Sequence, residues 1–177
     1  MARRRSLLQS YKVLDIVVAF SFLAGVGVLV LFLTGKSEHE IAGGVKIIDG
    51  DSLRVDGEEV RLIGIDAPES KQFCVKHGKK WSCGREASRH LRQLVSRGEI
   101  NCKGTGYDKY DRLLAKCSAG GVELNQMMVR DGWAVSLGNY AYEETKAEAA
   151  KAGIWAGKFD YPQDWRRRER RVDRWSN

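Results

Sequence analysis

Residues 45–65 contain two Asp-Gly steps, at 49–50 and 56–57, between short runs in which apolar and polar residues partly alternate. An Asp-Gly step in such a setting is a strong signal for a tight β-hairpin turn. This pattern predicts that the segment forms an antiparallel sheet. The three strands are expected near residues 45–49, 52–56 and 59–65.

Further elements are expected after the third strand. The apolar spacing predicts a helix within 85–98, then strands at 99–104 and 113–119, then helices within 122–133 and 142–155. Five short strands with a helix between the third and fourth are typical of an OB-fold. We therefore predict a mainly β, α+β domain: a five-stranded OB-fold barrel with three helices.

An uncharged apolar run, residues 16–33, precedes this domain. A run of this length can cross a bilayer as a helix, so we predict one N-terminal transmembrane helix. A cleavable signal peptide is the alternative, although its apolar region is usually only about 7–15 residues long. Basic residues precede the run and favour a cytoplasmic N-terminus. We expect a single-pass protein of the inner (plasma) membrane whose C-terminal domain is periplasmic or extracellular.

The chain is thus expected to have four parts: a basic stub and anchor (1–35), a linker (36–44), the folded domain (45–160) and a basic tail (161–177). The formal net charge is +7, yet residues 36–164 hold 20 Lys/Arg and 20 Asp/Glu. Attraction to nucleic acid or anionic lipid through net charge would therefore come from the tail or from local placement. A solvated charged end is an equally good interpretation of the tail.

All four cysteines lie on the expected outer side of the membrane, where oxidising conditions favour disulfides. Four cysteines allow three pairings. Their spacing favours Cys74–Cys83 across the loop expected at 71–84, and Cys102–Cys117 across a hairpin. Zinc is a poorer interpretation, because there is no C-x-x-C pair and no His at ligand spacing.

Two groups of carboxylates mark the ends of predicted strands. Asp49 and Asp51 flank one turn, and Asp66 and Glu69 flank Ala67-Pro68 at another. Either group alone is more often an ordinary turn or loop. If the first and third strands were neighbours, however, Asp51 and Asp66 would meet. Carboxylates that meet repel one another, and a hard divalent cation with oxygen ligands would relieve that repulsion.

Two arginines accompany these acids in the sequence. Arg61 opens the third strand, and Arg112 closes the segment "YDKYDR". A guanidinium fork matches phosphate oxygens, on which charge accumulates during phosphoryl transfer. A single arginine is more often part of a surface ion pair of little consequence.

The motifs "IDGDSL", "RLIGIDAPES", "GREAS", "DKYDR" and "AGIW" occur in the order and spacing of the staphylococcal nuclease (thermonuclease) family. The chain resembles that family over about residues 45–157, and its cysteines resemble a disulfide-containing, secreted branch. The resemblance implies an OB-fold with Ca²⁺-dependent phosphodiesterase activity on DNA and RNA.

The resemblance also implies roles for individual residues. Asp51, Asp66 and the Ala67 carbonyl correspond to the calcium ligands, and Glu69 to the general base that activates water. Arg61 and Arg112 correspond to the pair that clamps the reacting phosphate.

Four further positions resemble the family's substrate-binding residues. Lys109 and Tyr110 correspond to residues beside the terminal phosphate of the substrate. Tyr140 and Tyr142 correspond, with looser spacing, to tyrosines that bind the nucleotide, one of them by packing on the base.

Two positions depart from the family pattern. Ser52 replaces a threonine, which is a mild change. Asp111 stands where the family commonly has glycine, and aspartate tolerates a positive φ better than most residues. Its charge beside Arg112 is expected to weaken phosphate binding or to compete for the guanidinium.

The predicted function is a calcium-dependent nuclease that acts on DNA, RNA or both outside the cytoplasm. A monomer is expected, and no protein partner is implied. The alternative is an OB-fold module that binds nucleic acid or a partner with little or no catalysis. A structural membrane protein would require the ordered motifs to be coincidental.

Overall fold

The computed structural model describes residues 15–29 and 39–175. The chain divides into two units, Met1–Ser37 and Glu38–Asn177. The described part of the first unit is a helix over residues 15–29, and residues 30–33 of the apolar run lie outside the described residues. No helix in the part of the chain that is described is both long enough and apolar enough to cross a membrane, so the expected transmembrane helix is not found there.

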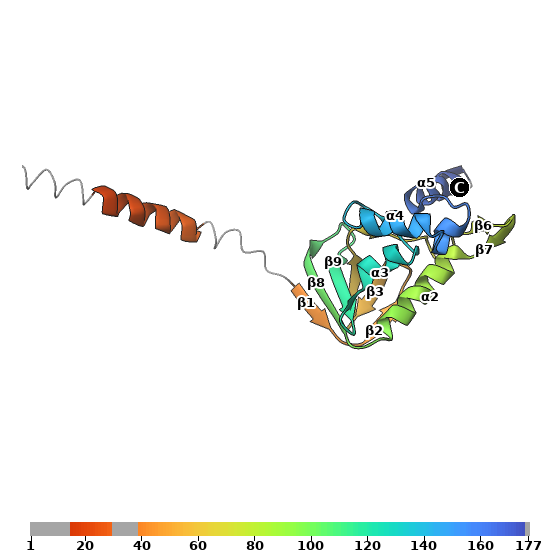
Figure 1. Ribbon diagram of the computed structural model, residues 1–177, viewed down its shortest axis with the longest axis horizontal. Helices are drawn as coiled ribbons and strands as arrows, with labels where there is room; N and C mark the ends of the chain where they lie inside the picture. Colours follow the sequence, from red (N-terminus) through yellow and green to blue (C-terminus); the bar gives the residue numbers. More distant parts are fainter. Residues whose placement is uncertain (1–14, 30–38, 176–177) are drawn as a thin grey trace, which may run out of the picture. The chain divides into compact units, whose positions relative to one another are not determined.

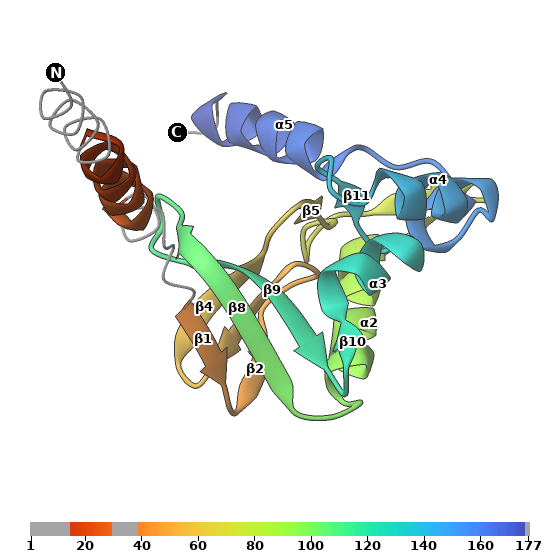
Figure 2. The ribbon, with the colours of Figure 1, turned by 60° about the vertical axis from the view of Figure 1, so that its left-hand side comes forward.

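The second unit is built on one strongly curved sheet (Figures 1 and 2). Its strands follow the order β1-β8-β9-β4-β3-β2, and β10 pairs with β9 beside this path. All neighbours are antiparallel except β4 and β9, which run parallel. The strands are β1 (His39–Ala42), β2 (Val45–Ile47), β3 (Ser52–Val55), β4 (Glu58–Leu62), β8 (Ile100–Tyr107), β9 (Leu113–Ala119) and β10 (Val122–Glu123).

Short strands and helices complete the unit. The pair β5 and β11 and the hairpin of β6 and β7 form separate two-stranded sheets. Their bounds are β5 (Ile65–Asp66), β6 (Cys74–Lys76), β7 (Lys79–Trp81) and β11 (Val135–Ser136). The helices are α2 (Cys83–Val95), α3 (Leu124–Arg130), α4 (Ala141–Ala149), a 3₁₀ turn (Gly153–Ala156) and α5 (Pro162–Trp175).

The core lies between the curved sheet and the helices α2 and α3, which stand together beside it in Figure 2. Leu53 and Val60 of the sheet, Leu91 of α2 and Met128 of α3 belong to one buried cluster. Burying such side chains is the main favourable term in folding. The α+β prediction is confirmed, and the arrangement is consistent with an OB-fold.

The strand order corrects one expectation. Strands β2, β3 and β4 correspond to the three strands predicted within residues 45–65 and form an antiparallel meander. Its first and third strands, β2 and β4, are not neighbours, because β3 lies between them and pairs with both. Hairpin connections place consecutive strands side by side, so this order follows from the two Asp-Gly turns themselves. Direct pairing of the first and third strands therefore cannot be what brings Asp51 and Asp66 close together.

Three segments expected to lack regular structure contain it. Residues 39–42, within the expected linker, form β1 and pair with β8. The loop 71–84 contains the β6–β7 hairpin. The basic tail forms α5, which begins at Pro162, a residue suited to the first helical turn. These elements have little apolar pattern, so their sequences gave no strong signal.

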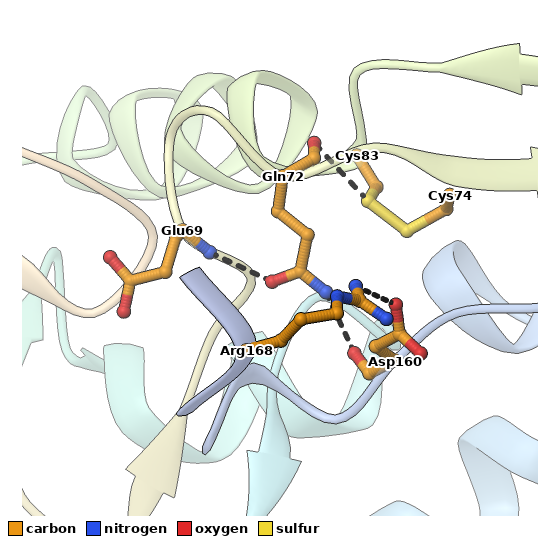
Figure 3. The surroundings of a disulfide bond; sticks show 6 residues. All are labelled: Glu69, Gln72, Cys74, Cys83, Asp160 and Arg168. Atoms are coloured by element: carbon orange, nitrogen blue, oxygen red, sulfur yellow. Dashed lines mark hydrogen bonds and ion pairs between the residues drawn. A yellow bond between two sulfur atoms is a disulfide. The ribbon is translucent and has the colours of Figure 1, made fainter. Parts of the chain in front are cut away.

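Both predicted disulfides are present. Cys102 and Cys117 are register partners on β8 and β9 and are bonded to one another. The Cys74–Cys83 bond joins β6 to the start of α2 (Figure 3). It flanks Gln72, whose buried side chain accepts a hydrogen bond from the Glu69 N–H at 3.2 Å. The disulfide and this amide together brace the loop that carries Glu69.

Two glycines let separate segments approach closely near that loop. A Cβ on Gly84 would lie 1.7 Å from the Glu69 carbonyl oxygen, and a Cβ on Gly50 would lie 2.7 Å from the Cβ of Ala67. Both distances are far below van der Waals contact. The start of α2 and the turn before β3 can reach the Ala67–Glu69 segment only because these side chains are missing.

We predict that Gly84→Ala lowers the free energy of unfolding by about 1–3 kcal/mol, the usual range for overpacking. Alanine is the better helix former, so propensity alone would give the opposite sign. Gly106→Ala is the control, since a Cβ there would meet nothing within 4 Å. Urea unfolding of both variants tests this, and equal stability of the two would contradict the close-approach argument.

Candidate functional site

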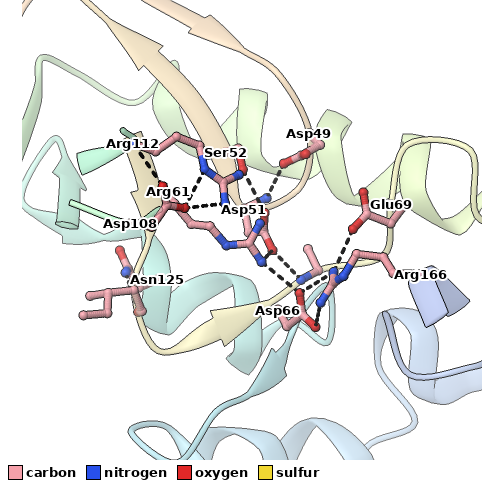
Figure 4. A network of polar contacts seen from close by, with 12 residues as sticks. Asp49, Asp51, Ser52, Arg61, Asp66, Glu69, Asp108, Arg112, Asn125 and Arg166 are labelled. Atoms are coloured by element: carbon pink, nitrogen blue, oxygen red, sulfur yellow. Dashed lines mark hydrogen bonds and ion pairs between the residues drawn. The ribbon is translucent and has the colours of Figure 1, made fainter. Parts of the chain in front are cut away.

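Two buried carboxylates form the centre of the site. Asp51 directly precedes β3, and Asp66 ends β5; each residue is 3% exposed. The Ala67 N–H, which follows β5, donates to Asp51 Oδ2 at 2.9 Å (Figure 4). Leu62 of β4 donates its N–H to the Asp51 carbonyl at 2.9 Å. The two acids therefore meet through the β3–β4 pairing and the turn into β5, and not through neighbouring first and third strands.

Arg61 bridges these carboxylates. Its Nη2 atom lies 3.0 Å from Asp51 Oδ2 and 3.0 Å from Asp66 Oδ1. Arg61 stands opposite Ser52 in the β3–β4 register, which places its side chain beside Asp51. One guanidinium thus partly neutralises two acids in a poorly solvated place, where electrostatic interactions are strong.

A second arginine reaches the same acids from the C-terminal helix. Arg166 of α5 holds Asp66 with two hydrogen bonds, Nη1 to Oδ1 at 2.9 Å and Nη2 to Oδ2 at 2.8 Å. Its Nη1 also donates to Glu69 Oε1 at 2.7 Å. The bonds to Asp66 and Glu69 raise the pKa of Arg166, although burial opposes the shift. The sequence predictions missed this residue, and the only signal for it was the arginine run of the tail.

Burial raises the pKa of Asp51 to about 8; the Arg61 charge opposes this shift, while Asp49 adds to it. The shift shows that one nearby guanidinium does not fully compensate the desolvated carboxylate. A further positive charge at Asp51 would lower its pKa and stabilise the ionised form.

Arg112 lies on the other side of the site and is held by Asp108. Its Nε and Nη2 atoms donate to Asp108 Oδ2 at 2.8 and 2.6 Å. Burial alone would raise the pKa of Asp108, but these bonds and two from the Arg112 and Tyr110 N–H groups lower it. The expected competition for the guanidinium thus comes from Asp108.

Asp111 adopts a positive φ of 63°. This is the left-handed conformation that the glycine of the family pattern would suit and that aspartate tolerates. Its N–H donates to the Asp108 carbonyl at 3.1 Å. The prediction about the backbone is therefore confirmed, and Asp111 acts as a turn residue here.

All three expected catalytic residues, Arg61, Glu69 and Arg112, line one open cleft with a volume of about 460 Å³. Its walls include Arg61, Glu69, Lys109, Tyr110, Arg112 and Arg166. A second cavity of about 550 Å³ is lined mainly by residues of β8 and β9 and includes none of the expected catalytic or metal-binding residues. The first cleft therefore has the better chemistry for a phosphate-bearing ligand, since five of its nine described lining residues are cationic and three, Asp49, Glu69 and Asp108, are acidic.

The two expected nucleotide-binding tyrosines lie elsewhere. Tyr140 is 5% exposed and belongs to the main core cluster, and its hydroxyl donates to Glu123 Oε1 at 2.5 Å. Tyr142 is exposed on α4, where Lys146 Nζ lies 4.3 Å from its ring centre. Neither is among the described residues that line the 460 Å³ cleft.

The donor chemistry at Asp51 and Asp66 suits a hard cation such as Ca²⁺, which prefers carboxylate and carbonyl oxygens. Burial raises the pKa of Asp51 even with Arg61 beside it, so a further positive charge there would stabilise the ionised carboxylate. Among the described residues, however, no three His, Cys, Asp or Glu side chains are grouped so that they could hold a metal ion. Both carboxylate oxygens of Asp66 already accept bonds from guanidinium groups. Asp51 and Asp66 could therefore bind a cation only if Arg166 first released its hydrogen bonds to Asp66.

Comparison with known proteins gives a consistent result. Residues 59–157 match the model of a family described as staphylococcal nuclease homologue. The succinoglycan biosynthesis protein ExoI of Rhizobium meliloti is 34% identical over 129 residues, 68% of this chain and 68% of the relative.

Two relatives are described as uncharacterized endonucleases. The protein of Haemophilus influenzae is 30% identical over 138 residues, 71% of this chain and 72% of the relative. That of Escherichia coli O157:H7 is 29% identical over 137 residues, 71% of this chain and 84% of the relative.

The raised pKa of Asp51 predicts how stability depends on pH in the presence of a chelator. The folded protein retains a proton that the unfolded chain loses above the ordinary pKa of 3.8, so the stabilisation disappears as the pH rises toward about 8. We expect the free energy of unfolding to fall over this range, and to fall less in Asp51→Asn. Denaturant titrations at several pH values measure both slopes. Equal slopes for the two proteins would contradict the assignment.

Proposed function

Because this chain belongs to the staphylococcal nuclease family, we propose that it is a calcium-dependent nuclease that hydrolyses phosphodiester bonds of DNA, RNA or both. The observation that carries the proposal is the shared cleft: Arg61, Glu69 and Arg112 come from separate segments of the chain and line the same opening. A carboxylate that lines a cleft together with two guanidinium groups can take a proton from water while the guanidinium groups bind a phosphate.

In this proposal Glu69 removes the proton from the attacking water. Its side chain is 28% exposed, so water can reach it, and the hydrogen bond from its N–H to Gln72 fixes its backbone. A positioned general base typically contributes about 10²–10⁴-fold to a rate. Arg61 and Arg112 stabilise the charge that develops on the phosphate oxygens.

Asp51 and Asp66, with backbone carbonyl groups such as that of Ala67, would hold the calcium ion. When bound, the ion polarises a phosphate oxygen and helps to orient water. The protein's own contribution is to bury the two acids together and to place Arg61 between them. Burial strengthens their attraction for a cation because little water competes.

Lys109 and Tyr110 are proposed to contact the substrate beside the reacting phosphate. Tyr110 is 67% exposed, and its ring lies 4.9 Å from Lys109 Nζ and 5.5 Å from Arg112 Cζ. An exposed ring flanked by cations can stack on a base while the cations attract the backbone, as in single-strand binding sites. Tyr142 is a more distant candidate, and the buried Tyr140 is unsuited to stacking on a base.

A binding module without catalysis is the second candidate. It is favoured by the fact that Arg112 is held by Asp108 and that Glu69 is held by Arg166. Both groups would have to change partners before they act on a phosphate.

We further propose that the catalytic domain acts outside the cytoplasm and is anchored to the plasma membrane through residues 1–35. Two disulfides support this placement, because such bonds persist mainly in oxidising compartments. The basic residues before the apolar run support the orientation.

Glu69→Gln tests the proposed function. The oxidised full-length chain is incubated with single-stranded DNA and with RNA, in Ca²⁺ and in chelator. We expect cleavage only in Ca²⁺, and a rate about 10²–10⁴-fold lower in Glu69→Gln, because the amide cannot accept the proton. Glu148→Gln, an exposed change on α4 with the same loss of charge, is the matched control and should cleave normally.

The outcomes separate the two candidates. Cleavage that survives chelation would contradict the proposed cation, and normal cleavage by Glu69→Gln would contradict the proposed base. Binding of nucleic acid without cleavage in saturating Ca²⁺ would favour the binding module.

A further inference from the structure

The first turns of α5 place a cation on the two acids that the reaction would need. Arg166 makes two bonds to Asp66 and one to Glu69, as Figure 4 shows. We propose that α5 is an internal blocking segment, and that Arg166 and a divalent cation are alternative occupants of this acidic site. This inference deepens the proposed function and rests on it.

The contacts of Asp66 argue for exclusion. Oδ1 accepts from both Arg61 and Arg166, and Oδ2 accepts from Arg166. Arg166 occupies both oxygens of Asp66, whereas Arg61 contacts Oδ1 alone. A divalent ion that takes Asp66 as a ligand needs an oxygen that Arg166 occupies, and its charge would repel the Arg166 guanidinium in this poorly solvated site. Arg166 therefore has to leave when an ion takes Asp66 as a ligand.

The same contacts block the proposed base. Glu69 Oε1 lies 2.7 Å from Arg166 Nη1. The guanidinium occupies that oxygen and stands where a water molecule would have to approach it. With Arg166 in place, both the cation site and the general base are hindered by a single side chain.

Helix α5 buries little surface against the rest of the domain, so the free energy needed to undock it is small. Pro162 is buried, and Trp165 and Arg166 are half-buried, whereas residues 167–172 are all exposed. Val172 is 57% and Trp175 is 90% exposed. Little apolar surface would be uncovered if the helix moved away, so the hydrophobic term holds it only weakly. The docked position depends mainly on polar contacts.

The segment before α5 is fixed independently. The Gln72 side chain donates to the Asp160 carbonyl at 2.7 Å, as Figure 3 shows, and Gln72 is itself fully buried. Arg168 binds the Asp160 carboxylate and adds a second link within the docked arrangement. Because Gln72 holds Asp160, α5 can move about the segment at Asp160 and Tyr161 without disturbing the loop that carries Glu69, once Arg166 and the other side chains of the helix give up their contacts.

A blocking segment lowers the apparent affinity for a ligand by the fraction of molecules that are open. If the docked form predominates by about ten to one, Arg166→Gln should lower the dissociation constant for Ca²⁺ about tenfold. The control is Arg167→Gln, which removes the same charge from the same helix at an exposed position paired with Asp164. It should bind Ca²⁺ as the unaltered protein does.

The measurement is calorimetric titration of Ca²⁺ alone into the oxidised full-length proteins, with circular dichroism to verify folding. A chain that ends at Tyr161 lacks the whole helix and should also bind Ca²⁺ about tenfold more tightly. If Arg166→Gln folds poorly, this truncated variant still measures the effect of removing Arg166 on Ca²⁺ binding. The same proteins are then assayed for Ca²⁺-dependent cleavage.

Tighter binding in both α5 variants, and not in Arg167→Gln, is the expected result. Equal or weaker binding in those variants, while the unaltered chain still cleaves in Ca²⁺, would overturn the blocking role and leave the proposed function intact. If no protein binds Ca²⁺ and none cleaves, the proposed function fails and the inference fails with it.

Discussion

Asp51 and Asp66 are buried side by side, close enough to share a single guanidinium nitrogen of Arg61. Burial is the largest cause of the raised pKa of Asp51, and the charges of Asp49 and Asp66 add to the shift, so this carboxylate resists ionisation. The arrangement is stable only with positive charge close by. Arg61 supplies part of it, and Arg166 supplies more from the far end of the chain. The proposed calcium ion would meet the same requirement.

The backbone around the acids is shaped by small residues. A Cβ on Gly50 would lie 2.7 Å from the Cβ of Ala67 and 2.9 Å from that of Ala87, and a Cβ on Gly84 would overlap the Glu69 carbonyl. The segments "DGD", "DAPE" and "GREAS" are distant in sequence and converge through these contacts. In "DGD" and "DAPE" the acids of the site stand beside Gly50 and Ala67, whereas "GREAS" supplies the small residues Gly84 and Ala87 against which those segments pack. The motifs are therefore informative together and weak alone.

Local patterns in the sequence predicted much of the fold. The Asp-Gly turns indicated the meander, and the spacing of Cys74 and Cys83 within one loop indicated their bond. Side-chain contacts between distant segments were beyond such patterns. Asp66 and Arg166 are 100 residues apart, and their pairing depends on where α5 docks. The burial of Tyr140 likewise depends on how α4 and its neighbours pack. A tyrosine is common both in protein cores and in binding sites, so its identity alone could not decide between the two.

We propose that Asp51, directly before β3, and Asp66, in β5, require a cation, which is either Arg166 or a metal ion. Crystal structures of the oxidised protein grown in chelator and in Ca²⁺ test it most directly. We expect Arg166 on Asp66 and Glu69 in chelator, and in Ca²⁺ an ion on Asp51 and Asp66 with Arg166 withdrawn. An ion bound at these acids with Arg166 unmoved, or no ion there at saturating Ca²⁺, would contradict the claim.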